Sequence, residues 1–131
     1  YGSIASDNFH CIYIDVNGLH ELNNQYGHKA GDTMLRFVAN SICSVFGTEH
    51  TYRIGGDEFV AFSLQDSSDI VAEKLKSLCR MVETKGYYIS VGSACWQDCE
   101  RNLDELIAQA EEAMYDNKRA FYQKHDRRGV R

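Results

Sequence analysis

Two carboxylates stand side by side on a glycine turn in the middle of the chain. Residues 54–59 read Ile-Gly-Gly-Asp-Glu-Phe, and segments 52–54 and 59–62 are rich in aromatic and β-branched residues, which predicts a hairpin. Asp57 and Glu58 repel each other unless a cation lies between them, and magnesium is usually held by one or two carboxylates plus substrate phosphates. The motif indicates metal-dependent chemistry on a nucleotide, with a solvated hairpin turn as the alternative.

A third carboxylate, Asp15, stands near the end of an apolar run. Residues 9–16 have the composition of a strand buried on both faces. An acid at a strand end ordinarily caps or contacts solvent, but at the exit of a central strand it can reach a metal held by a neighbouring hairpin. Together with Asp57 and Glu58, it would form the kind of cluster that two-metal phosphoryl and nucleotidyl transfer uses.

The remaining pattern predicts helices that alternate with a mostly antiparallel sheet, an α+β fold in which the first strand lies beside the hairpin. The glycines at positions 47 and 86 are expected to end two amphipathic helices, and Asn102 with Glu105 predicts a capping box for the last one. The further expected elements are a short helix and turn over 17–31, helices from Asp32 to 46 and from the N-cap segment 66–68 to 85, a strand over 87–96 and a helix over 103–121.

Composition narrows the class of protein. The 131 residues fit one domain, 1–131, with a polar, frayed tail over 124–131, and the missing initial Met suggests excision from a longer protein. The net charge of −5 argues against a nucleic-acid partner, and no apolar run is long enough for membrane contact by this domain, which we expect to be cytoplasmic even if the full-length protein is anchored. Five scattered cysteines fit reduced thiols rather than a zinc site.

Three motifs in order along the chain resemble those of the GGDEF family of diguanylate cyclases. As a family, these enzymes condense two GTP molecules into cyclic di-GMP and release pyrophosphate. The resemblance covers nearly all of the chain and implies a palm-like fold of the ferredoxin-like, nucleotidyl cyclase kind. The matching residues are Gly55-Gly56-Asp57-Glu58-Phe59, then 15–19 with Asn23 and 26–32, and finally 110–115 with Lys118.

The resemblance also implies a metal site and a catalytic pair. Asp15, the Val16 carbonyl and Asp57 would be ligands of Mg²⁺ or Mn²⁺. Glu58 would be a further carboxylate that helps bind the metal or removes the proton of the 3′-hydroxyl. Asp57 and Glu58 are therefore the expected catalytic residues.

The same resemblance implies a GTP site. Asn23 and Asp32 would read guanine, because an Asp accepts from the N1 and N2 hydrogens and adenine lacks that donor pair. By themselves, these two residues fit a turn Asn and a helix N-cap Asp. The residues expected to contact the rest of GTP are Gly56, the backbone of Leu19 and His20, and Lys118, whose alternative role is a solvated lysine at a helix end.

The chain departs from the family pattern at the phosphate positions. His20 stands where the family usually has Lys, and Tyr122 stands where an Arg is common, with Arg119 as a possible replacement. Both changes are expected to weaken the affinity for triphosphate. The product-inhibition motif RxxD is absent from positions 46–49, so no feedback at that site is expected.

The predicted function is a diguanylate cyclase domain that acts as a homodimer with one GTP per subunit, under the control of a sensor or regulatory domain. The alternative is a degenerate, non-catalytic GTP-binding module, which His20 and Tyr122 favour. A purely structural interaction domain is a third, weaker hypothesis, because it would not need Asp57 and Glu58 together on a diglycine turn.

Overall fold

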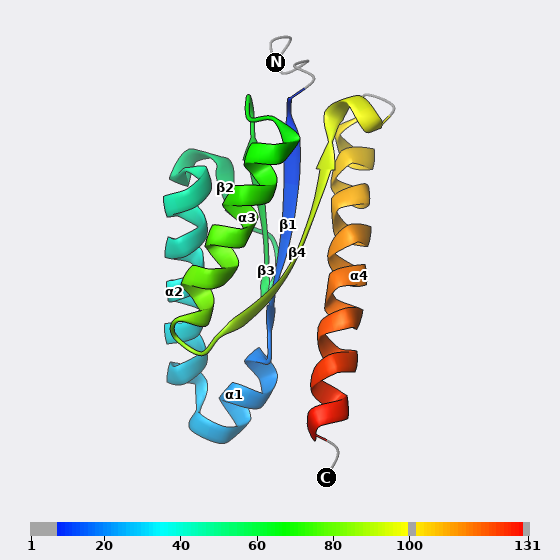
Figure 1. Ribbon diagram of the computed structural model, residues 1–131. Coiled ribbons are helices and arrows are strands. Elements are labelled where there is room, and N and C mark those ends of the chain that lie inside the picture. Colours follow the sequence, from blue (N-terminus) through cyan, green and yellow to red (C-terminus); the bar gives the residue numbers. More distant parts are fainter. Residues whose placement is uncertain (1–7, 100–101, 130–131) are drawn as a thin grey trace.

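The computed structural model describes residues 8–99 and 102–129, which form a four-stranded antiparallel sheet with helices on both faces (Figure 1). The strands lie in the order β2-β3-β1-β4, which confirms the predicted α+β class and the position of the first strand beside the hairpin. The strands are β1 (His10–Asn17), β2 (Thr51–Arg53), β3 (Glu58–Ser63) and β4 (Tyr88–Cys95). The α-helices are α1 (Leu19–Tyr26), α2 (His28–Phe46), α3 (Ser68–Glu83) and α4 (Leu103–Gly129), with short 3₁₀ turns at Thr48–His50 and Trp96–Asp98.

The central strand β1 is buried along its whole length, as its apolar composition predicts. Its side chains alternate between the two faces of the sheet. Ile12, Ile14 and Val16 belong to the core that α2 and α3 cover, whereas Cys11 and Tyr13 belong to the core under α4. Figure 1 shows α2 and α3 on one side of the sheet and α4 on the other.

The two faces of the sheet carry hydrophobic cores of different size. The face under α2 and α3 is the larger apolar core, formed by residues such as Val38, Ile42 and Leu78. The face under α4 is smaller, and Leu106, Ala110 and Met114 supply its helical side. By the same alternation, the acid two residues after Tyr13 lies under α4, which places it in the smaller core.

A glycine allows α4 to pack tightly on β4. A Cβ atom at Gly92 would lie 2.2 Å from the Met114 nitrogen and 2.5 Å from the Ala110 carbonyl oxygen. Both neighbours are backbone atoms, which cannot move aside as a flexible side chain can. The close approach therefore requires glycine at this position.

Some boundaries differ from those expected. α2 begins at His28, after Gly27, so Asp32 lies in its second turn and is not the N-cap residue. Glycine suits this boundary because Gly27 has φ 93°, a left-handed conformation. α4 extends to Gly129, so helical backbone covers most of the segment 124–131 that the sequence analysis assigned to a tail, and residues 130–131 lie outside the described part.

Two caps are confirmed. Ser67 Oγ accepts a hydrogen bond from the Ile70 nitrogen at the start of α3, and Asn102 Oδ1 accepts from the Asp104 and Glu105 nitrogens at the start of α4. These bonds satisfy backbone donors that a helix start leaves without partners.

All five cysteines are free thiols, and burial raises the pKa of Cys11 to about 12. Within residues 8–99 and 102–129, none of the helices combines the length and apolar character of a membrane span.

The packing at Gly92 gives a stability prediction. Gly92→Ala should lower the free energy of unfolding by about 3 kcal/mol, because the added methyl group forces α4 away from β4. Urea denaturation followed by circular dichroism measures this loss. The matched control is Gly56→Ala, whose Cβ would meet no atom within 4 Å and should cost no stability. Equal effects of the two substitutions would contradict the packing argument.

Candidate active site

Three acids from two distant parts of the chain converge at one end of β1 and β3. Asp15 pairs with Glu58 across the antiparallel ladder, and Asp57 precedes Glu58 on the turn. One ligand oxygen from each of the three carboxylates lies within 4.8 Å of the others. This is the juxtaposition that the sequence predicted, and it is the one His/Cys/Asp/Glu cluster with metal-binding spacing in the described residues.

Backbone hydrogen bonds hold the diglycine turn against the end of β1. The Val16 nitrogen donates to the Asp57 carbonyl at 2.8 Å, and since the N–H and C=O of one strand residue point to the same side, the Val16 carbonyl also faces this turn. Arg53 adds a clamp: its Nε donates to the Gly55 carbonyl at 3.1 Å and its Nη2 to the Gly56 carbonyl at 2.7 Å. The sequence analysis missed Arg53, although its place directly before the turn was a usable signal.

The glycines of the motif do not adopt the left-handed backbone conformations that glycine permits. Neither Gly55 nor Gly56 has positive φ. A Cβ at Gly56 would meet no atom within 4 Å, so the value of glycine here is an open backbone that another group can approach closely.

Glu58 is oriented from the neighbouring strand. Tyr13 Oη donates to Glu58 Oε1 at 3.1 Å, and Tyr13 lies two residues before Asp15 on the same face of β1. Burial and the hydrogen bond to Glu58 raise the pKa of Tyr13, so its hydroxyl stays a donor at neutral pH. Sequence reasoning also missed this residue, though the period of two along β1 could have indicated it.

Asp15 is the most buried member of the cluster, with a relative exposure of 1%. Lys118 Nζ reaches from α4 to within 2.5 Å of its Oδ2. Neither Asp15 oxygen receives a hydrogen bond of regular geometry from the described residues, so Lys118 supplies charge but leaves the carboxylate poorly solvated.

The direction of the Asp15 pKa shift indicates that Lys118 does not fully offset the cost of burying this carboxylate. Burial raises the pKa of Asp15, the contact with Lys118 lowers it, the charge of Asp57 raises it again, and the net shift is upward. At Lys118, burial lowers the pKa, but the close contact with the Asp15 carboxylate and its charge outweigh this effect and raise it. One ammonium group therefore does not balance three acids in this setting.

The cluster has the chemistry of a divalent-cation site. Mg²⁺ binds oxygen ligands at about 2.1 Å, so two ligands on opposite sides of the ion lie roughly 4 Å apart. The carboxylates, at no more than 4.8 Å, need only a small closure to meet this spacing. Asp15 also offers a buried oxygen, Oδ1, for which the described residues supply no hydrogen-bond donor. The residues present thus fit a hard divalent cation.

The two predicted guanine readers lie on neighbouring helices. Asn23 on α1 packs against Gly31 on α2, where a Cβ would lie 1.9 Å from Asn23 Oδ1. A side chain at position 31 would thus displace the Asn23 amide from its present position. Asp32 follows Gly31 with an exposed side chain. Asn23 Oδ1 is buried without a hydrogen-bond partner among the described residues.

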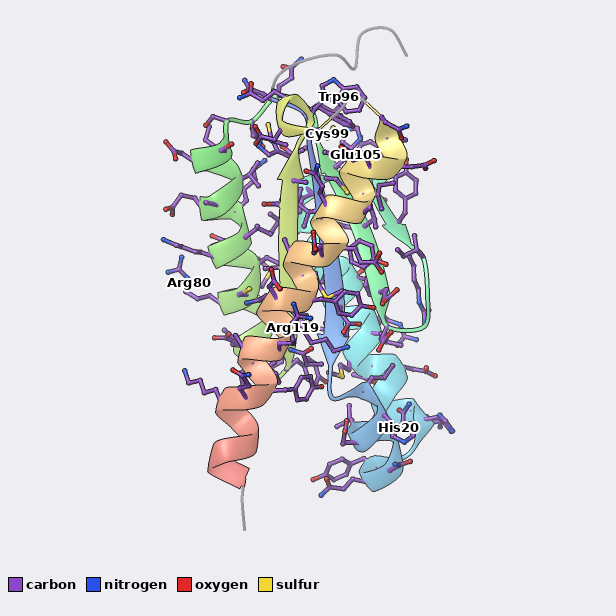
Figure 2. All side chains as sticks on the ribbon, turned by 90° about the vertical axis from the view of Figure 1, so that its right-hand side faces the viewer. His20, Arg80, Trp96, Cys99, Glu105 and Arg119 are labelled. Atoms are coloured by element: carbon purple, nitrogen blue, oxygen red, sulfur yellow. The ribbon has the colours of Figure 1, made fainter. Side chains whose placement is uncertain are left out.

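The turn between β1 and α1 offers backbone rather than cationic side chains. Gly18 has φ 78°, a left-handed conformation that favours glycine, and a Cβ there would meet no atom within 4 Å. Leu19 is half-buried against the main core, so only its backbone could contact a ligand. His20 is exposed on α1 (Figure 2).

Tyr122, which stands at the position where the family commonly has Arg, contacts this turn through its hydroxyl. It is half-buried one turn after Lys118, and burial raises its pKa while a hydrogen bond from the Gly18 backbone opposes that rise. A cavity of about 350 Å³ beside it is lined by other aromatic residues and carries Glu21 as its charged side chain. Arg119, labelled in Figure 2, forms an exposed ion pair with Asp116 on the same helix.

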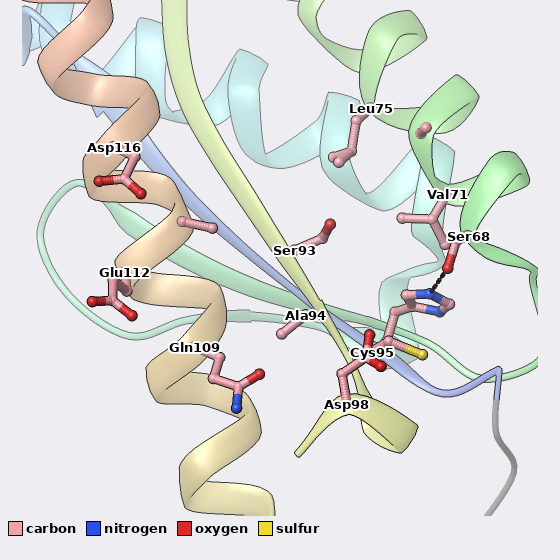
Figure 3. A pocket seen from close by; sticks show the side chains of 13 residues that line it. Ser68, Val71, Leu75, Ser93, Ala94, Cys95, Asp98, Gln109, Glu112 and Asp116 are labelled. Carbon is pink, nitrogen blue, oxygen red and sulfur yellow. Dashed lines mark hydrogen bonds between the residues drawn. The ribbon is translucent and has the colours of Figure 1, made fainter.

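Another cavity, of about 580 Å³, lies between α3 and α4 beside β4 (Figure 3). There the ring of the buried His10 hydrogen-bonds Ser68 Oγ at 3.1 Å. Its lining contains none of the residues predicted for metal, GTP or catalysis, so its size does not make it the nucleotide site.

Comparisons with known proteins agree with these features. Residues 3–124 match the family described as "Diguanylate cyclase, GGDEF domain". Diguanylate cyclase DosC of Escherichia coli (strain K12) is 29% identical over 119 residues, which cover 82% of this chain and 26% of DosC. The chain thus spans about a quarter of that relative.

Solved structures share the fold. A sensory box/GGDEF family protein from Caulobacter crescentus CB15 superposes with a TM-score of 0.75 at 29% identity, over 86% of this chain and 79% of that one. A microbial GGDEF domain, whose interaction with bis-(3,5)-cyclic di-GMP was determined, gives a TM-score of 0.74 at 32% identity, over 86% and 73% of the two chains.

The acidic cluster gives a metal-binding prediction. Asp57→Asn should weaken the affinity for Mn²⁺ by about 10-fold or more, because it removes one of the charged oxygen ligands. Electron paramagnetic resonance of free Mn²⁺ measures the affinity. Glu73→Gln is the control, since Glu73 is an exposed acid on α3 outside the cluster. Mn²⁺ affinity unchanged by Asp57→Asn would argue against this cluster as the metal site.

Proposed function

Since the chain belongs to the diguanylate cyclase GGDEF domain family, we propose that it condenses two GTP molecules into cyclic di-GMP and releases pyrophosphate. The observation that supports this most directly is the convergence of Asp15, Asp57 and Glu58, with ligand atoms within 4.8 Å. Such a cluster serves phosphoryl chemistry because it can hold cations where the attacking and leaving oxygens gain charge.

In this proposal, Asp15, Asp57 and the Val16 carbonyl hold Mg²⁺ or Mn²⁺. The bound cation would supply Lewis-acid stabilisation of phosphate charge. Glu58 contributes a further ligand or accepts the proton of the 3′-hydroxyl. The hydrogen bond from Tyr13 at 3.1 Å holds one Glu58 oxygen and leaves the other for either task.

Substrate selection is assigned to the α1–α2 pair and the adjoining turns. Asn23 accepts and donates hydrogen bonds at the guanine edge, and Asp32 accepts them. The buried Asn23 Oδ1, which has no partner among the described residues, supports this role. The open backbones of Gly56 and of the turn ahead of Leu19 and His20 allow phosphates to approach closely. Lys118 is the cation assigned to the phosphates.

The reaction requires two copies of the chain. Each subunit holds one GTP, and each 3′-hydroxyl attacks the α-phosphate held by the partner subunit. In-line attack depends on the mutual position of the two half-sites, so a fixed homodimer gains the rate advantage of proximity. We propose that the chain is one GGDEF-type domain of a longer cytoplasmic or membrane-anchored protein, in which a sensor or regulatory domain sets this dimer geometry.

A second candidate is a non-catalytic GTP-binding module, and Tyr122 favours it. Its hydroxyl takes the hydrogen bond of the Gly18 backbone, a donor that would otherwise be available to a phosphate. The exposed imidazole of His20 is also a weaker phosphate partner than lysine at neutral pH. The acidic cluster is compatible with both functions, so a product assay decides between them.

The decisive assay uses the chain fused to a dimerising coiled coil, with GTP and Mg²⁺, and detects cyclic di-GMP by mass spectrometry. Product is expected, and Asp57→Ala with Glu58→Ala should reduce its formation by about 100-fold or more. Glu73→Ala with Glu83→Ala, two exposed acids on α3, controls for the change of charge. GTP binding without product would favour the non-catalytic module, whereas product from the Asp57/Glu58 variant would refute the site assignment.

Base selectivity tests the guanine readers separately. Asp32→Ala should lower the preference for GTP over ATP by roughly 10-fold, because it removes a charged acceptor for the guanine donors. Isothermal titration calorimetry with each nucleotide measures the preference. Asp69→Ala, at an exposed acid in the first turn of α3, should leave it unchanged. A preference that survives Asp32→Ala would remove Asp32 from the site.

A further inference from the structure

The position of Lys118 differs from the role that its place in the sequence suggests. A phosphate-binding lysine would point into the substrate site, yet its Nζ lies 2.5 Å from Asp15 Oδ2, on a residue assigned to the metal. Asp15 is 1% exposed, so this ammonium group, and not solvent, is the immediate countercharge of a buried carboxylate.

The Lys118 ammonium and a divalent cation compete for the same carboxylate. A cation bound through Asp15, Asp57 and Glu58 would sit close to Asp15, and like charges at such separations repel strongly where water is largely excluded. The lysine is the partner that can leave. Its side chain is 32% exposed and its four-carbon stem is flexible, whereas Asp15 is held within the central strand.

A destination for the lysine lies on the same side of α4. Tyr122, one turn further along α4, contacts the backbone of Gly18 through its hydroxyl. Residues four apart on a helix share a face, so Lys118 and Tyr122 both look towards the end of β1 and the turn that follows. This turn has the open backbone at Gly18 that the proposed function assigns to the phosphate side of the site.

We propose that Lys118 is an internal counter-ion that holds the metal site in the absence of metal and moves to a substrate phosphate when the divalent cation binds. This inference rests on the proposed function and adds an exchange step to it. The ion pair keeps the three acids together without metal, and the exchange links metal binding to readiness for the triphosphate. Because Lys118 occupies Asp15 without metal, it should lower the affinity for metal alone. Because it contacts a phosphate after the exchange, it should raise the affinity for metal with nucleotide.

Trace acetylation of lysines, read residue by residue by mass spectrometry, tests the exchange in the unmodified sequence. Lys118 should be weakly labelled without metal, several-fold more strongly labelled with saturating Mg²⁺, and protected again when a non-hydrolysable GTP analogue is added. Lys74 on α3 is a matched internal control, since it forms a 2.6 Å ion pair with Asp66. Its side-chain exposure of 36% is close to the 32% of Lys118. Its labelling should not respond to Mg²⁺ or to nucleotide.

Calorimetry with two variants tests the linkage. Lys118→Met should bind Mg²⁺ alone about 5-fold more tightly or better, and should bind the Mg²⁺–GTP analogue more weakly than the unmodified protein. Arg119→Met removes the same charge from the next residue on α4, where the arginine pairs with Asp116, and should change neither affinity.

The outcomes separate this inference from the proposed function. Mg²⁺ binding that leaves Lys118 labelling unchanged would show that the lysine stays on Asp15, and it would overturn the exchange while the cyclase assignment stands. Equal effects of Lys118→Met and Arg119→Met would reduce the role of Lys118 to general charge and overturn the exchange as well. No Mg²⁺ binding by calorimetry would overturn both.

Discussion

The buried carboxylate of Asp15 is the constraint on which the rest of the site depends. A charge removed from water requires close countercharge or hydrogen bonds, and its free-energy cost is large without them. Here the countercharge comes from Lys118 on α4, which covers the face of the sheet opposite the largest core. The end of the central strand and α4 must therefore stay together, because the contact with Lys118 lowers the pKa of Asp15 whereas the charge of Asp57 on the diglycine turn raises it.

The strand register and the alternation of side chains along β1 bring the residues of the site together. The antiparallel pairing sets Asp15 opposite Glu58, and the two-residue period of β1 places Tyr13 beside the same acid. On the other face, the same period supplies the apolar residues under α2 and α3. One short strand thus carries both the main core and the polar cluster, and a register shift of one residue would exchange them.

The phosphate side of the site differs from the metal side in how closely it follows the family. The acids and the diglycine turn are intact, whereas Tyr122 and His20 replace basic residues of the family pattern. Tyr122 also takes a backbone donor at Gly18 and stands beside a cavity whose charged group is the acid Glu21. In the proposed function, the chain would therefore rely on Lys118 for phosphate binding more heavily than the family pattern implies.

The sequence alone determined the α+β class, the hairpin, most element boundaries within a few residues and the identity of the three acids, because alternation, capping and glycine turns are local signals. It placed the start of α2 too late. Only the tertiary structure decided that Lys118 binds Asp15, that Arg53 clamps the turn and that Gly92 admits α4. Each of these contacts depends on how segments pack in three dimensions. The spacing of residues along the chain does not determine how closely a helix approaches a strand.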